Sequence, residues 1–276
     1  MTTFYGQHEV ITGDCLTVLR GLPDGIAACT VTSPPYWRQR QYTDGDSLEL
    51  GQEATLAEFV ANLVTVFAEV RRVSREDATL FVNLGDVWNG TGRAGGDYRP
   101  GCKREGQRPP PGRWDGSMKK KDLALAPAAL AMALRDSGWW LRQEIVWSKG
   151  WASPGSAPDR PVTTHEMVYM LAASHRYRTF DASKHGTVWE IRPATGAAGH
   201  HAAMPVDLAS RCIEIGSEPG DLILDPFGGT GTTAIAAHRL GRRAILIELG
   251  EDHADAARKR IAAETAQLSL LEGLPA

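Results

Sequence analysis

The first residues whose types could do chemistry run from Ser33 to Tyr36 and read Ser-Pro-Pro-Tyr. Each proline fixes its own φ and lacks an N–H donor, and a residue before proline is driven to an extended conformation. The stretch is therefore a stiff corner that displays acceptors, namely the Ser33 hydroxyl and the carbonyls of Ser33 and Pro34. Such a corner could bind the N–H groups of an amine, while Tyr36 and Trp37 offer flat faces for stacking on a base. In a disordered segment the same prolines would indicate a peptide motif, but here they directly follow a β-branched run.

A second candidate site is the glycine-rich turn that follows Asp225 and reads Pro-Phe-Gly-Gly-Thr-Gly. Glycines let a backbone approach a ligand closely, and the helix expected after them would present free amide N–H groups. A phosphate-binding loop of the usual kind is excluded, because no lysine precedes Thr232 or Thr233. Glu248 lies 23 residues after Asp225, near the spacing of about 20 residues at which an acidic side chain reaches a ribose diol. The pattern favours a nucleoside cofactor, and the alternative is a structural turn with a solvent-facing carboxylate.

These two sites need strands and helices to position them, and the apolar pattern predicts seven strands and five helices. Strands are expected at residues 8–13, 27–32, 78–84, 139–147, 166–173, 221–225 and 243–248. Helices are expected at residues 54–73, 122–137, 205–216, 232–240 and 251–265.

Alternating strands and helices predict an α/β fold, a doubly wound and mainly parallel seven-stranded sheet with helices on both faces. The strands at 139–147 and 166–173 lack a helix between them, so they are expected to form an antiparallel pair that leaves one antiparallel strand at the edge. Both candidate sites follow strands, and ligands of such sheets bind at the carboxyl ends of strands. We expect one domain over residues 1–276, with a loose tail at 268–276.

Composition limits the classes of protein to consider. The 276 residues are 42% hydrophobic and 23% charged, which is ordinary for a globular protein. No apolar run approaches the roughly 20 residues of a membrane span, and no signal peptide opens the chain. The four cysteines are scattered without a Cys-x-x-Cys pair, so we expect reduced thiols, no metal site and a cytoplasmic protein. The pair His200-His201 has no third ligand at a useful spacing.

The charge is unevenly distributed, although the net charge is only −3. Residues 89–121, which we call the basic segment, contain nine Lys or Arg side chains and three Asp or Glu side chains. This segment is also rich in Gly and Pro, so we expect a long surface loop inserted in the domain. It could contact nucleic acid, or it could be a solvated disordered loop.

The stretch Thr32-Ser-Pro-Pro-Tyr-Trp resembles the catalytic motif of the S-adenosylmethionine-dependent DNA amino-methyltransferases. The stretch from Asp225 to Thr233 resembles the cofactor loop of the same family. The catalytic motif comes first and the cofactor loop lies near the C-terminus, which is the permuted order of the β-class. Further similar stretches are GDCLTVL, LFVNLGD, IVWSKG, DRPVTTHEMVYML and HHAAMPVDLASRCI, so the resemblance spans nearly the whole chain except the basic segment.

The resemblance implies a role for each matching residue. Asp14, with the backbone of Cys15, would contact the cofactor adenine, and Glu248 would bind the ribose hydroxyls. The methionine part would lie against the loop and the start of the preceding helix. The cofactor-binding residues are then Asp14, Cys15, Met204, Pro205, Asp225, Phe227, Gly228, Gly229, Thr230, Gly231, Thr232, Thr233 and Glu248. From the residues alone, Asp14 could instead cap a helix beginning at Leu16, and Asp86 could either line the pocket or cap a turn.

The reaction implied is methyl transfer from S-adenosylmethionine to the exocyclic N4 amine of a cytosine flipped out of duplex DNA. The catalytic residues would be Ser33, Pro34, Pro35 and Tyr36. Serine before Pro-Pro-Tyr is typical of N4-cytosine enzymes, whereas Asp or Asn there is typical of N6-adenine enzymes, which are the alternative. No cysteine lies in this motif, which argues against methylation of carbon 5 through a thiol adduct. A nucleic-acid-binding module without activity and a methyltransferase of small molecules or proteins are further alternatives.

The expected partner is double-stranded DNA, together with a cognate restriction endonuclease that acts on the same site. The protein would be a monomer or a homodimer. Cations would contact phosphates, and groove-facing side chains would give specificity. The DNA-binding candidates are Trp37, Arg38, Arg40, Arg93, Arg99, Lys103, Arg104, Arg108, Arg113, Lys119, Lys120 and Lys121.

Overall fold

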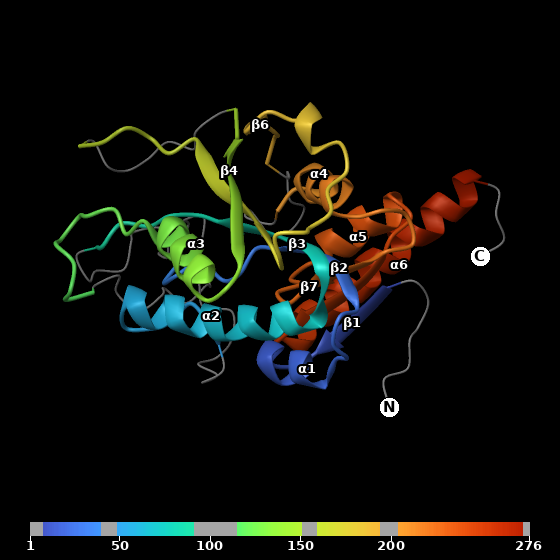
Figure 1. The fold of residues 1–276 in the computed structure, drawn as a ribbon, viewed down its shortest axis with the longest axis horizontal. Coiled ribbons are helices and arrows are strands. Elements are labelled where there is room, and N and C mark those ends of the chain that lie inside the picture. Colours follow the sequence, from blue (N-terminus) through green and yellow to red (C-terminus); the bar gives the residue numbers. More distant parts are fainter. Residues whose placement is uncertain (1–7, 40–48, 91–114, 151–158, 194–203, 273–276) are drawn as a thin grey trace, which may run out of the picture.

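The computed structural model describes residues 8–39, 49–90, 115–150, 159–193 and 204–272, with side chains as far as residue 266 (Figure 1). These residues build one sheet with helices against both of its faces. The predicted α/β architecture, doubly wound and mainly parallel, is confirmed.

The sheet contains eight strands in the order β1-β8-β7-β2-β3-β5-β4-β6. Their bounds are β1 His8–Thr12, β2 Ala27–Thr32, β3 Ser74–Leu84, β4 Trp140–Ser148, β5 His165–Ala172, β6 Val188–Glu190, β7 Leu222–Asp225 and β8 Arg243–Glu248. The predicted count of seven strands is wrong because β6 is missing from it. This strand has three residues, of which only Trp189 is buried, so it is too short to show an alternating pattern.

The predicted antiparallel pair of β4 and β5 is confirmed, but its predicted place at the edge is wrong. β5 is the strand that runs antiparallel to its neighbours, and it lies inside the sheet between β3 and β4. The edge is β6, which pairs in parallel with β4. A strand pairing of this kind depends on contacts between distant segments, which a local hydrophobic pattern does not contain.

Six helices cover the sheet: α1 Cys15–Gly21, α2 Leu56–Val73, α3 Ala126–Asp136, α4 Val206–Gly216, α5 Thr232–Arg239 and α6 Glu251–Glu272. The first three pack on one face, where Leu19, Phe59 and Leu130 belong to one buried cluster. The last three pack on the other face, where Leu208 and Ile261 belong to a second cluster (Figure 1). α6 continues through Glu272, so residues 268–272 of the predicted tail are helical, and 273–276 lie outside the described residues.

Local sequence explains the longest helix of the first face. The Thr55 side chain accepts a hydrogen bond from the Glu58 N–H, and the Glu58 carboxylate accepts one from the Thr55 N–H, which forms a capping box. Phe59, Leu63 and Val70 then recur at helical spacing and are fully buried against the sheet. α2 thereby supports β2, the strand that leads to the Ser-Pro-Pro-Tyr corner, and the neighbouring strand β3.

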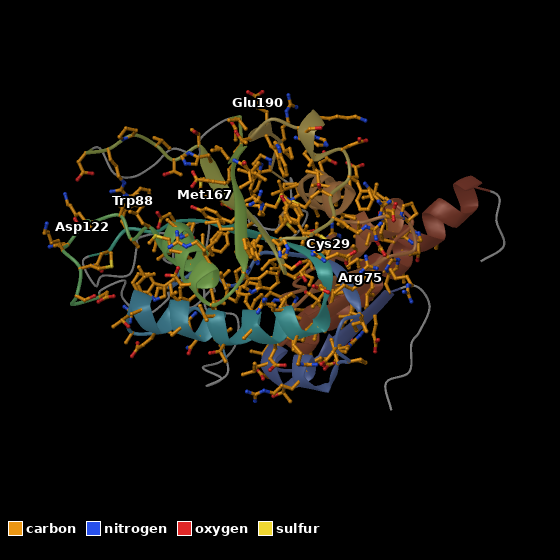
Figure 2. All side chains as sticks on the ribbon, viewed as in Figure 1. Cys29, Arg75, Trp88, Asp122, Met167 and Glu190 are labelled. Atoms are coloured by element: carbon orange, nitrogen blue, oxygen red, sulfur yellow. The ribbon has the colours of Figure 1, made fainter. Side chains whose placement is uncertain are left out.

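One edge of the sheet gathers the candidate residues. β1, β8, β7, β2 and β3 are consecutive neighbours and all parallel, so their carboxyl ends meet at this edge. β5 begins at this edge because it runs antiparallel to β3, and β4 ends there because it runs antiparallel to β5. Figure 2 follows this direction along β3, from Arg75 near its start to Trp88 beyond its end. Every loop that leaves this edge can therefore contribute to one site.

Candidate active site

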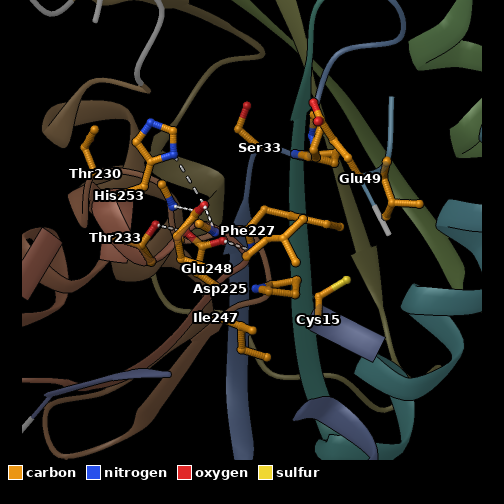
Figure 3. Close-up of a pocket in the computed structure, with 18 of the residues that line it drawn as sticks. Cys15, Ser33, Glu49, Asp225, Phe227, Thr230, Thr233, Ile247, Glu248 and His253 are labelled. Carbon is orange, nitrogen blue, oxygen red and sulfur yellow. Dashed lines mark hydrogen bonds and ion pairs between the residues drawn. The ribbon is translucent and has the colours of Figure 1, made fainter. Parts of the chain in front are cut away.

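A pocket lies at the carboxyl edge of β1, β8, β7 and β2, and both sequence-predicted motifs line it (Figure 3). All four residues of the Ser-Pro-Pro-Tyr corner line this pocket, and so do most residues of the glycine-rich turn. Of the predicted residues, the pocket brings together Asp14, Cys15, Ser33, Pro34, Pro35, Tyr36, Met204, Asp225, Phe227, Gly228, Gly229, Thr230, Thr232, Thr233 and Glu248. Figure 3 shows Ser33 facing the space opposite His253 and Thr230. Two motifs from opposite ends of the chain thus share one cavity because β2 and β7 are neighbours in the sheet.

The glycines of the glycine-rich turn are needed for two reasons, close packing at one position and a positive φ at two others. Gly228 gives a close approach, since a Cβ there would lie 2.8 Å from the Leu246 Cβ. Gly229 and Gly231 both have positive φ, at +49° and +82°, a conformation that glycine adopts at little cost. Gly231 faces Ile261 of α6, is the N-cap residue of α5 and is not among the residues that line the pocket.

Glu248 ends β8 and points into the pocket beside this turn. Its carboxylate accepts hydrogen bonds from the N–H of Gly229 at 2.9 Å and the N–H of Gly250 at 3.1 Å. His253, at the start of α6, places its Nδ1 3.7 Å from Oε1 of Glu248. This carboxylate raises the pKa of His253 above its ordinary value. His253 also lines the pocket, and its position shortly after Glu248 was not recognised in the sequence.

Asp14 both caps a helix and lines the pocket. It is the N-cap of α1, and its carboxylate accepts from the N–H and the hydroxyl of Thr17, each at 2.8 Å. The helix begins at Cys15 rather than at the predicted Leu16. Cys15 is buried, and desolvation raises the pKa of its thiol to about 12, so it is not a thiolate at neutral pH.

Asp225 is buried at the end of β7 and holds the two motifs together. Its Oδ1 accepts from the Thr32 hydroxyl at 2.6 Å and from the Phe227 N–H at 3.1 Å, and its Oδ2 accepts from the Thr233 hydroxyl at 2.6 Å. Desolvation raises the pKa of Asp225 to about 6. Groups of the protein itself thus occupy this carboxylate, and we assign it a structural role in the pocket.

Tyr36 connects the corner to three residues for which the sequence predicts no individual role. Its hydroxyl donates to Glu166 Oε2 at 2.5 Å and lies 3.3 Å from Asn83 Oδ1. Lys149 Nζ lies 2.5 Å from Glu166 Oε1. The stretches LFVNLGD, IVWSKG and DRPVTTHEMVYML contain Asn83, Lys149 and Glu166, so the signal was present as a resemblance without a role for each residue.

Two predicted DNA-binding residues of the corner are buried, and their assignment is corrected. Trp37 is 3% exposed and belongs to the core cluster, with its Nε1 donating to the Glu53 carbonyl at 3.1 Å. Arg38 is 8% exposed, and its Nε donates to the same carbonyl at 2.8 Å. Both side chains thereby tie the chain directly after the corner to the Glu53 carbonyl. Arg40 lies outside the described residues.

The basic segment is described only at its two ends, residues 89–90 and 115–121. The Asn89 side chain donates to the carbonyls of Asp115, Met118 and Lys119, and thereby ties the two ends together. Lys119 and Lys120 are exposed, and Lys121 is paired with Asp159 at 2.6 Å. The predicted contacts at Arg93, Arg99, Lys103, Arg104, Arg108 and Arg113 lie outside the described residues.

Two further predictions concern residues that lie beside the pocket rather than in it. Asp86 caps a helix, since its Oδ1 accepts from the N–H of Val87 at 2.8 Å and of Ala126 at 3.1 Å, at the start of α3. Pro205 is the N-cap residue of α4 and is not a lining residue, whereas its neighbour Met204 is. His200 and His201 lie outside the described residues.

The charges around the pocket discriminate between classes of ligand. Its acidic lining residues are Asp14, Glu49, Asp225 and Glu248, and no Lys or Arg is among the lining residues that the structure describes. A ligand with phosphate groups would meet like charge here, whereas a ligand with cationic groups would be stabilised.

Within the described residues, no three His, Cys, Asp or Glu side chains are grouped to hold a metal, and no helix is long and apolar enough to cross a membrane.

Comparisons with known sequences agree with this geometry. Residues 27–259 match the model of a family described as DNA methylase. The chain is 38% identical over 265 residues to the type II methyltransferase M.Cfr9I of Citrobacter freundii, covering 91% of this chain and 87% of that protein. It is 35% identical over 266 residues to the type II methyltransferase M.SmaI of Serratia marcescens, covering 92% and 90%.

Solved structures share the fold. A DNA modification methylase of Thermus thermophilus, in complex with S-adenosyl-L-methionine, superposes with a TM-score of 0.66 at 27% identity and covers 94% of each chain. The PvuII DNA methyltransferase, described as cytosine-N4-specific, superposes with a TM-score of 0.68 over 95% of this chain and 92% of that one. Its identity of 18% makes this a likeness of fold alone.

Proposed function

This chain belongs to the DNA methylase family, and from that premise we propose that it transfers a methyl group from S-adenosylmethionine to the N4 amine of a cytosine in double-stranded DNA. One observation carries the proposal. The acceptor corner at Ser33 and the glycine-rich turn before α5 line the same pocket, so an amine and a nucleoside cofactor could meet there. A DNA methyltransferase requires both sites within reach of each other.

S-adenosylmethionine is the cofactor that the pocket fits. The molecule supplies a methyl group on a positively charged sulfur, and it also carries an ammonium group. The acidic lining, without Lys or Arg among the described lining residues, is suited to these cations. Glu248 would accept hydrogen bonds from the ribose hydroxyls, Asp14 lies at the neighbouring strand end for the adenine, and the backbone of Gly229 would face the methionine part.

The Ser-Pro-Pro-Tyr corner would orient the amine. The target base must leave the duplex, because its amino group is otherwise paired and stacked. Ser33 Oγ and the Pro34 carbonyl would accept the two N–H bonds of the amine, and the ring of Tyr36 would stack on the flipped base. These residues accelerate the reaction by position and by stabilising the charge that develops on the amine.

The choice of base rests on the first position of the motif. Serine before Pro-Pro-Tyr is typical of N4-cytosine enzymes, and this chain has Ser33 there. N6-adenine methylation is the second candidate, because a hydroxyl and a carboxylate can both accept hydrogen bonds from an amine. The two candidates differ in the base that is methylated, so the modified nucleoside distinguishes them.

The deciding experiment expresses the protein in cells whose DNA lacks both modifications and digests that DNA to nucleosides. Mass spectrometry should find N4-methylcytosine, and it should find much less of it when Ser33→Ala replaces the wild type. N6-methyladenine as the sole product would refute the assignment of the base, and no modified base at all would refute the proposed activity. Calorimetry with S-adenosylmethionine tests the cofactor separately, since binding needs no DNA.

The proposed partners follow from the same reaction. The basic segment would contact DNA phosphates through Lys119 and Lys120, which are exposed at its described end. The relatives are type II methyltransferases by name, so we propose a cognate restriction endonuclease that cleaves the same sequence. Mapping the methylated sites would define that sequence, and DNA methylated by this protein should resist the matching endonuclease.

A further inference from the structure

We infer that Glu166 is a positioning residue that holds the ring of Tyr36 in the orientation needed to stack on the target base, and that Lys149 holds Glu166. The inference rests on the proposed function, because it assumes that Tyr36 stacks on a base. The contacts come from three neighbouring parts of the sheet, namely the end of β3, the residue directly after β4 and the start of β5.

The hydroxyl of Tyr36 is held at a fixed point. It donates to Glu166 Oε2 at 2.5 Å, and the amide of Asn83 also lies against this oxygen, with Nδ2 at 3.3 Å. Asn83 Nδ2 in turn donates to the Met167 carbonyl at 3.2 Å, so the amide is itself anchored to β5. A hydrogen bond to a carboxylate is short and strong compared with a bond between neutral groups.

The ring of Tyr36 is also held along one side. Gly85 follows β3, and a Cβ at this position would lie 2.6 Å from Cε2 and 3.1 Å from Cδ2 of Tyr36. The ring therefore lies directly against the Gly85 backbone, and only a glycine leaves room for it. A tyrosine has two side-chain torsions, and the contact at Gly85 together with the bond at Glu166 restrains both.

Lys149 keeps the Glu166 carboxylate in place. Its Nζ lies 2.5 Å from Glu166 Oε1, and it also lies over the Trp147 ring, 5.0 Å from the centroid. The Glu166 side chain is only 14% exposed and that of Lys149 is 27% exposed. A carboxylate so far removed from water needs a nearby cation, and each of its oxygens is engaged here, one by Lys149 and one by Tyr36.

This arrangement predicts effects on turnover rather than on cofactor binding. Tyr36→Phe keeps the ring and removes only the hydroxyl, and Glu166→Ala removes its acceptor. Each variant should lower kcat on unmethylated plasmid DNA about tenfold, with the Kd of S-adenosylmethionine unchanged. Both changes break the same bond, so the double variant should be no slower than the slower single variant. Lys149→Ala should lower kcat in the same way, and Lys149→Arg should restore most of it.

A second tyrosine–glutamate pair offers a matched control. Tyr169 of β5 donates to Glu144 Oε2 of β4 at 3.4 Å, and neither residue lines the pocket. Glu144→Ala and Tyr169→Phe should leave kcat at the wild-type value. Equal losses at both pairs would assign the effect of Glu166 to general destabilisation of the sheet and would overturn the inference.

Tyr36→Ala distinguishes the proposed stacking role of Tyr36 from the proposed positioning role of Glu166. If Tyr36→Ala loses activity while Tyr36→Phe and Glu166→Ala keep it, Tyr36 stacks as proposed but Glu166 does not position it. If Tyr36→Ala retains full activity, the proposed role of Tyr36 in the reaction fails. Glu166→Gln serves where Glu166→Ala does not fold, and retained binding of S-adenosylmethionine shows that a variant is folded.

Discussion

Thr32 and Asp225 lie 193 positions apart in the sequence, and the Thr32 hydroxyl donates a 2.6 Å hydrogen bond to Oδ1 of Asp225. Asp225 also accepts from the Thr233 hydroxyl, so a single buried carboxylate joins the strand before the Ser-Pro-Pro-Tyr corner to the first turn of α5. The Ser-Pro-Pro-Tyr corner and the glycine-rich turn are thereby held next to each other. The proposed methyl transfer would depend on this placement, because correct positioning of the reacting groups lowers the barrier.

Thr32→Val removes this hydrogen bond and keeps the shape of the side chain. The buried Asp225 carboxylate would lose one of its donors, which costs about 1–3 kcal/mol of stability. We also expect kcat to fall about tenfold, since the corner would no longer be tied to the cofactor turn. Urea denaturation and methyl-transfer assays measure the two effects.

Thr30→Val is the matched control for this substitution. Thr30 lies two residues earlier on β2 and is fully buried, but its hydroxyl has no hydrogen-bond partner among the described residues. Replacing an unpaired hydroxyl by a methyl group should leave stability unchanged or raise it. If Thr30→Val and Thr32→Val lose the same stability, the bond to Asp225 contributes nothing specific.

Asp225→Asn should change how activity depends on pH. Burial raises the pKa of Asp225 from 3.8 to about 6, so the carboxyl loses its charge as pH falls through about 6. A protonated carboxyl must donate its own hydrogen, and it then competes with the donors Thr32 and Thr233. We expect wild-type kcat to fall on the acid side with a midpoint near 6, and this midpoint to disappear in Asp225→Asn.

The pH dependence of the free energy of unfolding tests the raised pKa of Asp225 independently. The folded-state pKa of Asp225 is raised, so ionisation is easier in the unfolded chain. Its contribution to the free energy of unfolding is therefore full below about pH 4 and is lost as pH rises to about 6. The difference in stability between the wild type and Asp225→Asn should change across this window. An identical pH dependence in both proteins would assign the change to another group.

Ser33→Ala should lower turnover about a hundredfold, because the hydroxyl is proposed to accept a hydrogen bond from the amine that reacts. The affinity for S-adenosylmethionine should remain unchanged, since Ser33 acts on the base. Steady-state kinetics and calorimetry on the same preparation separate the two quantities. Retention of most of the activity would show that the hydroxyl is not an essential acceptor.

Glu248→Gln should weaken cofactor binding and lower the pKa of His253. A neutral amide is a weaker acceptor for the ribose hydroxyls, so we expect Kd to rise about tenfold. The carboxylate is the main reason that the His253 pKa is raised, and the pKa should return toward its ordinary value. NMR titration of the histidine measures it. Glu251→Gln, an exposed neighbour paired with Arg258, should leave both quantities unchanged.

Replacing Lys119, Lys120 and Lys121 together by glutamine should weaken binding to all DNA sequences alike. Each phosphate contact contributes about 0.9 to the slope of log affinity against log salt, so the slope should flatten by about 2 to 3. Lys184→Gln, an exposed lysine in the short helix Ala182–Lys184, is the control and should bind like the wild type. A wild-type salt slope in the triple variant would show that these lysines do not contact phosphates.

Residue types that act over a few neighbours were sufficient to predict the two motifs and most of the elements. Prolines restrict their own torsions and those of the preceding residue, which made the corner after Thr32 recognisable. Glycines with positive φ made the turn before α5 recognisable in the same way. The alternation of apolar runs predicted a doubly wound sheet, and this sheet placed both motifs at one edge.

Contacts between distant strands could not be predicted from these patterns. Trp37 was expected to face DNA, yet it is buried, because the chain beyond the corner folds back onto Glu53. Glu166 and Lys149 carried no recognisable role until β5 was found between β3 and β4, where Glu166 reaches Tyr36 and Lys149 reaches Glu166. Local torsional preferences determine which turn or helix a segment forms, whereas the order of strands depends on how the whole chain buries its apolar surface, and that order decides which side chains meet.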